Sequence, residues 1–251
     1  MKIVYDERYR EVYSSDPAAM PGRMESICEE LRGGFEFVEL EPATEEDLRL
    51  IHEENHISSV KRNAPVYEVA VLAVGGAIRA AELAMRREPA FGLIRPPGHH
   101  ASRDSSWGFC YFNNIAISIE KLRRRSRITK ALIVDIDLHY GDGTANIFAD
   151  SPDVSYFHVK AQGRQRYLDN LREYLDVQHD CDIIAVSAGF DRHELDWGGL
   201  LRTEDYWSIG RTIRKYAESV CDGKRYAVLE GGYNLEVLGK NVKALLVGMQ
   251  S

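Results

Sequence analysis

The chain of 251 residues lacks the features that mark several broad classes of protein. Its four cysteines (Cys28, Cys110, Cys181, Cys221) are widely separated and form no C-x-x-C pair, which argues against a zinc knuckle or a disulfide framework. No apolar run approaches the roughly 18–20 residues of a membrane span, so we expect no membrane partner. The first residues, MKIVYDERYR, lack the apolar core of a secretory signal. A cytoplasmic location is therefore the default expectation.

The chain also lacks a long basic block, and its formal net charge is −7. Because proteins that bind the phosphate backbone need clustered positive charge, we do not expect nucleic acid as a direct partner. A hydrophobic content of 44% and a charged content of 28% are ordinary for a globular protein. No linker, low-complexity segment or internal repeat divides the sequence. These features favour one domain over residues 1–251, and they leave its oligomeric state open.

Short apolar segments alternate with helix-like segments, which indicates an α/β domain around a mostly parallel sheet. We expect strands at residues 2–5, 91–94, 131–134, 154–159, 182–187 and 226–229. We expect helices at about 21–31, 44–53, 69–85, 114–124, 142–148, 167–175, 203–220 and 235–249. Arg23 lies in the first of these helices and is interpreted as a solvated charge.

Four of the expected strands end in polar residues flanked by glycine. These strands lead to His99-His100, to the Asp135/Asp137/His139 series, to Asp191 and to Tyr233. In open α/β sheets the ligand crevice lies outside the carboxyl ends of the strands. The polar residues can therefore meet at one place, as the residues of an active site do.

Asp137, His139 and Asp191 could serve as metal ligands. Two carboxylates and an imidazole leave a fourth tetrahedral position for water, as in a catalytic zinc site. Bound zinc lowers the pKa of such a water towards about 7. The oxygen-rich set would also accept Fe2+ or Co2+. The alternatives are a salt-bridged strand end for a single aspartate and a turn-stabilising side chain for Asp191.

His99 and His100 could act as general acid and base, with Asp135 and Asp142 as the carboxylates that fix their tautomers. The alternative is that one histidine only caps the loop. Tyr233 follows two glycines and could donate its phenol to a developing oxyanion, unless it is a packed aromatic residue. Together these residues describe metal-assisted hydrolysis of a carbonyl compound.

Five segments in this order, RPPGHHA, GFCYFNN, VDIDLHYGDGT, SAGFD and LEGGYN, resemble the motifs of the zinc-dependent histone deacetylase superfamily. The similarity is greatest to class II members and to the acetoin-utilisation and acetylpolyamine amidohydrolase branch. PGRMESICEEL, near the start, is similar to the N-terminal helix of the family. The resemblance implies the three-layer arginase/deacetylase fold with a central sheet of about eight strands. It also implies a single catalytic domain with shortened active-site loops.

The resemblance implies a role for each polar residue named above. By this resemblance, Asp137, His139 and Asp191 hold Zn2+. His100 is the general base and acid and is paired with Asp142, while His99 forms an electrostatic pair with Asp135. Tyr233 stabilises the oxyanion. Substrate binding is assigned to Gly108, Phe109 and Gly232. The implied reaction is attack of metal-activated water on an N-acyl amide, which removes acetyl or another short acyl group from a lysine side chain or a small amine. An acetylpolyamine deacetylase is the main alternative.

His158 marks a departure from the family pattern. The family has a serine at this position that helps to hold a structural potassium ion (K+) with the backbone of Asp135, Asp137 and His139, so His158 argues against that site. The long Gly/Pro-rich loop that normally follows is also missing. We therefore expect a shallower and more open site. The substrate-holding aspartate of the family has no obvious match before Val69.

Trp107 and Trp197 are large residues on expected rim loops, and we expect both to be packing residues rather than part of the entrance. Two other functional classes stay open. A ureohydrolase of the arginase type would use a two-manganese cluster with more aspartates, and it would not need the histidine pair and Tyr233 together. A non-catalytic acyl-amine-binding module would explain the shortened loops, although every residue needed for turnover is present.

Overall fold

The computed structural model describes residues 1–177 and 180–250, which contain a sheet of seven parallel strands. The strands are β1 (Lys2–Val4), β2 (Glu36–Val38), β3 (Ala90–Gly92), β4 (Ala131–Asp135), β5 (Val154–His158), β6 (Ile183–Ala188) and β7 (Arg225–Leu229). Their order across the sheet is β2-β1-β3-β7-β6-β4-β5. The predicted α/β fold is confirmed, with seven strands in the described residues where the resemblance implied about eight.

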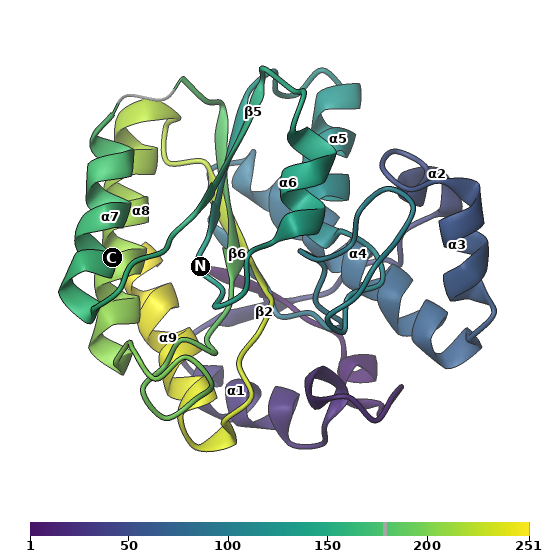
Figure 1. The fold of residues 1–251 in the computed structure, drawn as a ribbon, viewed down its shortest axis with the longest axis horizontal. Coiled ribbons are helices and arrows are strands. Elements are labelled where there is room, and N and C mark those ends of the chain that lie inside the picture. Colours follow the sequence, from purple (N-terminus) through teal and green to yellow (C-terminus); the bar gives the residue numbers. More distant parts are fainter. Residues whose placement is uncertain (178–179, 251) are drawn as a thin grey trace.

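Helices cover both faces of the sheet and complete three layers (Figure 1). One layer contains α1 (Arg23–Leu31), α7 (Arg164–Asp176), α8 (Thr203–Val220) and α9 (Leu235–Gln250). The other contains α4 (Ala64–Ala84), α5 (Asn114–Arg124) and α6 (Asp142–Phe148), with α2 (Glu45–Leu48) and α3 (Glu54–Lys61) at its outer side. None of the described helices has the length and apolar character needed to cross a membrane.

The central strands are apolar because helices cover them on both sides. Every residue of β4, β6 and β7 is buried. A strand of this kind needs apolar side chains on both faces and therefore reads as a continuous apolar run. This is why the sequence located these strands to within a residue or two.

Four elements were not predicted: β2, α3 and two short 3-10 helices, Glu7–Arg10 and Pro17–Ala19. β2 is a three-residue edge strand with no buried residue, so it has no apolar run to reveal it. The helix predicted over residues 44–53 ends at Leu48, and α3 then begins at Glu54. α4 begins at Ala64, before the predicted start at Val69.

The structure corrects the interpretation of Arg23 as a solvated charge. Its side chain is fully buried, and its Nε donates a hydrogen bond to the carbonyl oxygen of Gly232 at 2.8 Å. Its Nη2 donates to the carbonyl oxygen of Glu230. A buried charge needs such partners because its desolvation is costly. Arg23 thereby fastens α1 to the segment that follows β7.

Candidate active site

The four strands that lead to polar residues, β3, β7, β6 and β4, are neighbours at the centre of the sheet. Because all of them are parallel, their carboxyl ends lie at the same edge. The predicted convergence of the polar residues therefore has its structural basis in the strand order.

Asp137, His139 and Asp191 each offer a ligand atom within 4.8 Å of the others. The Nδ1 atom of His139 lies 3.4 Å from Oδ1 of Asp137 and 3.2 Å from Oδ2 of Asp191. β4 ends at Asp135, so a loop rather than strand alternation places this trio. The backbone N–H of Leu138 donates to Asp191 at 3.0 Å, and that of His139 donates to Asp137 at 2.9 Å.

The trio has the properties of a site for one divalent metal ion. The Oδ2 atom of Asp191 is buried and has no hydrogen-bond partner. Burial and the neighbouring charge of Asp137 raise the pKa of Asp191 to about 6, and a bound cation would relieve both effects. A Cβ atom on Gly231 would lie 2.6 Å from the Asp137 carboxylate and 2.9 Å from that of Asp191. Glycine at this position keeps the space beside both ligands open.

Each of the two adjacent histidines is held by a carboxylate. The Nδ1 atom of His99 lies 3.1 Å from Asp135, and that of His100 lies 2.7 Å from Asp142. Burial would lower the pKa of His99, but the charges of Asp137 and Asp135 outweigh it and raise this pKa. Burial and the charge of His99 lower the pKa of His100. Divergent pKa values in one site indicate separate electrostatic and proton-transfer roles.

The carboxylate of Asp135 is occupied by protein donors. Its Oδ1 accepts from the backbone N–H of Asp137 at 3.0 Å, and its Oδ2 accepts from the hydroxyl of Tyr156 at 2.8 Å as well as facing His99. Among the described residues at this edge, the carboxylate and imidazole atoms left over to bind a metal are therefore enough for one ion. The two-metal cluster of a ureohydrolase would need further uncommitted carboxylates. The sequence did not single out Tyr156.

A cavity of about 130 Å³ lies over the trio and is lined by both histidines, Gly108, Phe109, His139 and Tyr233. Burial raises the pKa of the Tyr233 phenol, which keeps it protonated as a donor must be. The predicted substrate-binding residue Gly232 is placed differently, since its carbonyl accepts from Arg23 and Gly231 lines the cavity instead.

Trp107 and Trp197 stand at the mouth of this cavity, which corrects the expectation that both are packing residues. Their exposures are 55% and 53%. The Trp107 ring lies 3.9 Å from the His100 ring, and its Nε1 donates to Asp142 at 2.9 Å. The Trp197 ring stacks on Tyr233 with centroids 4.1 Å apart. Trp107 therefore contacts two of the predicted catalytic side chains, His100 and Asp142, and Trp197 contacts a third, Tyr233.

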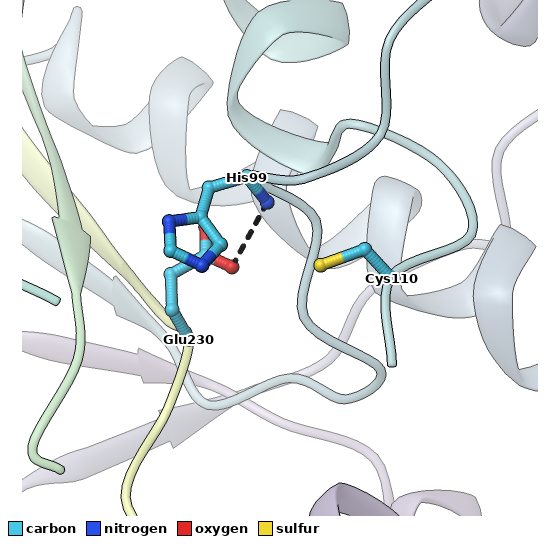
Figure 2. Close-up of side chains that lie close together, drawn as sticks. All are labelled: His99, Cys110 and Glu230. Carbon is cyan, nitrogen blue, oxygen red and sulfur yellow. Dashed lines mark hydrogen bonds between the residues drawn. The ribbon is translucent and has the colours of Figure 1, made fainter. Parts of the chain in front are cut away.

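Glu230 is a site residue that the sequence analysis did not assign, although its position at the end of β7 was a signal. It is fully buried, and its Oε2 accepts from the backbone N–H groups of Gly98 at 2.7 Å and His99 at 3.2 Å. Ser187 donates to Oε1 at 3.1 Å. Figure 2 shows the bond to His99, with Cys110 nearby. The three labelled residues are close enough to bind a metal, but the Glu230 oxygens already have donors, so Glu230 supports the histidine loop.

Comparison with known proteins agrees with this geometry. The histone deacetylase domain matches residues 18–167 and 160–249. A probable deacetylase of Methanothermobacter thermautotrophicus is 32% identical over 85% of this chain and 78% of its own length. A probable deacetylase of Archaeoglobus fulgidus is 32% identical over 92% of this chain and 77% of its own. The polyamine deacetylase HDAC10 of Danio rerio is 28% identical over 96% of this chain but only 46% of its own.

The crystal structure of the HDA15 HD domain has the same fold, with a TM-score of 0.83 and 23% identity over 98% of this chain and 87% of that one. The resemblance inferred from the sequence motifs is thereby confirmed, and the chain belongs to the histone deacetylase family.

Proposed function

We propose that this protein is a zinc-dependent deacetylase that removes acetyl or another short acyl group from a lysine side chain or a small amine. One observation carries the proposal: both histidines, Tyr233 and His139 of the trio line a single cavity, and the ligand atoms of Asp137 and Asp191 lie within 4.8 Å of that of His139. The family membership and the names of the two archaeal relatives support it. We also propose that residues 1–251 act as one catalytic domain. The cytoplasmic location stays a prediction from the sequence.

The residues have complementary roles in this reaction. A divalent ion held by the trio would lower the pKa of a water molecule and polarise the acyl carbonyl. His100, oriented by Asp142 through Nδ1, can accept a proton at Nε2 and return it to the leaving amine. Its lowered pKa keeps it unprotonated near neutral pH, as a base must be.

The other two groups stabilise negative charge. Asp135 orients His99, and in the metal-free protein the charges of Asp137 and Asp135 raise the pKa of His99, which favours a positively charged imidazole beside the reacting carbonyl. Tyr233 donates its phenol hydrogen to the oxygen that gains charge in the transition state. Its ring is held between Trp197 on one side and the edge of Phe109, 6.1 Å away, on another.

The mouth of the site supports an acyl-amine substrate of modest size. A cavity of about 130 Å³ suits a short acyl group better than a long chain. The exposed faces of Trp107 and Trp197 can contact an alkyl stem or a cationic amine. Acetylpolyamines are the alternative substrates, supported by the polyamine deacetylases of Danio rerio and Homo sapiens among the relatives. The chain spans less than half the length of either of these two relatives.

The test is a substrate screen with metal analysis. Zinc-loaded protein is assayed on acetyl-lysine peptides, acetylpolyamines and amines with longer acyl chains, and then again with iron or cobalt in place of zinc. We expect turnover of at least one acetylated amine, its loss on chelation and its recovery with zinc. Absence of turnover on every substrate with each metal would favour the non-catalytic binding module.

Tyr233→Phe tests the assigned mechanism. The variant loses the oxyanion donor, and we expect kcat to fall by at least about a hundredfold. Tyr67→Phe on α4, whose hydroxyl contacts Glu45, is the matched control and should keep full activity. Unchanged kcat in Tyr233→Phe would reject the mechanism.

A further inference from the structure

A cluster of backbone carbonyl groups lies behind the metal-ligand loop. The carbonyl oxygen of Asp137 accepts from Nε of Arg192 at 3.1 Å and faces Nε2 of His158 at 2.9 Å. The carbonyl oxygens of Leu138 and Val159 accept from Nη2 of Arg192 at 3.1 Å and 3.3 Å. One guanidinium therefore bridges the loop that carries two of the proposed metal ligands and the end of β5.

Arg192 is built into this position. Its side chain is 7% exposed, and its guanidinium carbon lies 5.0 Å from the centre of the Tyr167 ring. The guanidinium brings a positive charge to these carbonyl groups, because arginine side chains are not deprotonated in proteins.

A potassium ion does not fit this arrangement. The family resemblance implied such an ion at the backbone of the Asp135-to-His139 segment, with a serine where His158 stands. Here the Asp137 carbonyl is directed at the donors of Arg192 and His158, and a free cation would have to lie beside a fixed guanidinium. Of the carbonyl groups implied to hold the ion, that of Asp137 faces Arg192 and His158, and that of Asp135 accepts from the backbone N–H of Val159 at 2.9 Å.

We propose that Arg192 takes the place of the alkali-metal ion, as a covalently attached monovalent cation that positions the Asp137–His139 loop. It is a positioning residue, since it contacts the backbone of the metal-binding loop and lies outside the cavity lining. The stabilisation that a bound ion gives rises with the logarithm of its concentration above the Kd, whereas an arginine is always present. The protein should therefore be indifferent to potassium in both stability and zinc affinity.

The test compares the Tm of metal-free protein and its zinc affinity in potassium chloride and in tetramethylammonium chloride at equal ionic strength. Neither Tm nor zinc affinity depends on catalytic activity, so this test of Arg192 is independent of the test of the proposed function. We expect both quantities to be the same in the two salts for the wild type. A rise in Tm or zinc affinity that is specific to potassium would overturn the proposal.

Variants of Arg192 extend the test. Arg192→Ala opens a space lined by carbonyl oxygens, and we expect zinc affinity to fall by about 10- to 100-fold, as loss of groups that support metal ligands typically does. Potassium should recover at least part of that loss, and Arg192→Lys should retain more affinity than Arg192→Ala. Arg192→Met, of similar length without charge, serves if the alanine variant does not fold.

Arg166→Ala is the matched control, because Arg166 lies on α7 with its side chain 58% exposed and paired with Glu173. It should behave like the wild type in both salts. Equal zinc affinity in Arg192→Ala and Arg166→Ala would overturn the proposal. So would a loss in Arg192→Ala that neither potassium nor the lysine variant reduces, since that result indicates packing rather than charge.

Discussion

Binding of zinc should release a proton from this protein. The carboxylates of Asp137 and Asp191 lie 3.4 Å and 3.2 Å from Nδ1 of His139 and raise its pKa to about 10, so the metal-free imidazole is protonated at neutral pH. A histidine must be neutral to bind a metal, and the metal therefore competes with this proton. The experiment therefore measures zinc affinity at a series of pH values.

The magnitude follows from the two pKa values at the site. As the pH falls from about 9 to about 7, apparent zinc affinity should fall by up to about tenfold per pH unit, because one proton must leave His139. Below about pH 6 Asp191, whose pKa is raised to about 6, also binds a proton, and the fall should approach about a hundredfold per unit. The His139 side chain is 41% exposed, so solvent screens its ion pairs and the first slope is an upper limit.

Titration calorimetry measures both quantities. Zinc binding at one near-neutral pH in two buffers of different ionisation enthalpy should give release of about one proton per zinc. In His139→Asn the release near neutral pH should disappear, whereas His56→Asn on α3 should behave like the wild type. Zinc affinity that is flat from about pH 6 to about pH 8, with no proton released by the wild type, would refute this reasoning.

Three further predictions concern residues that surround the ligands. Burial raises the pKa of Glu230 to about 7 from 4.5, so the folded state holds a proton that the unfolded chain releases, and this carboxyl makes the wild type less stable as pH rises through that window. Urea unfolding of Glu230→Gln should lack that slope, and equal slopes would contradict the assignment. Gly231→Ala places a methyl group 2.6 Å from the Asp137 carboxylate and should weaken zinc binding by at least about tenfold. The circular dichroism spectrum should not change. Retained zinc affinity would show that the open space beside the two carboxylates is not needed. Trp107→Phe keeps an aromatic ring over His100, the proposed general base, but removes the N–H donated to Asp142, and kcat should fall by about 5- to 10-fold. A change confined to KM would assign the indole to substrate contact instead.

The sequence predicted the position of the site because strand direction alone determines it. Once the apolar runs before His99, Asp135, Asp191 and Tyr233 are assigned to parallel strands, their following residues must lie at one edge. The detailed geometry did not follow from alternation along a strand, however. β4 stops at Asp135, and loop hydrogen bonds place the next two ligands.

The contacts that depend on distant backbone could not be predicted. The residues next to Arg23 and Arg192 in the sequence give no sign that their guanidinium groups are buried. The carbonyl groups that accept their hydrogen bonds belong to segments far away along the chain. Trp107 and Trp197 were misassigned for a different reason. The sequence around a tryptophan on a loop does not distinguish a ring that packs against the protein from one that lines the entrance of a cavity. β2 was missed because an exposed edge strand of three residues carries no apolar signal.

The bond from Arg23 to the Gly232 carbonyl means that α1 and the segment after β7, which lie far apart in the sequence, cooperate in building one edge of the proposed active site. The same guanidinium lies 5.5 Å from the centre of the Tyr233 ring. Replacing this guanidinium, as in Arg23→Met, would leave every proposed metal ligand and both histidines in place, yet it would remove the tether beneath the phenol. Such a variant should still bind zinc while being a poor catalyst, which would separate metal binding from turnover within a single polypeptide.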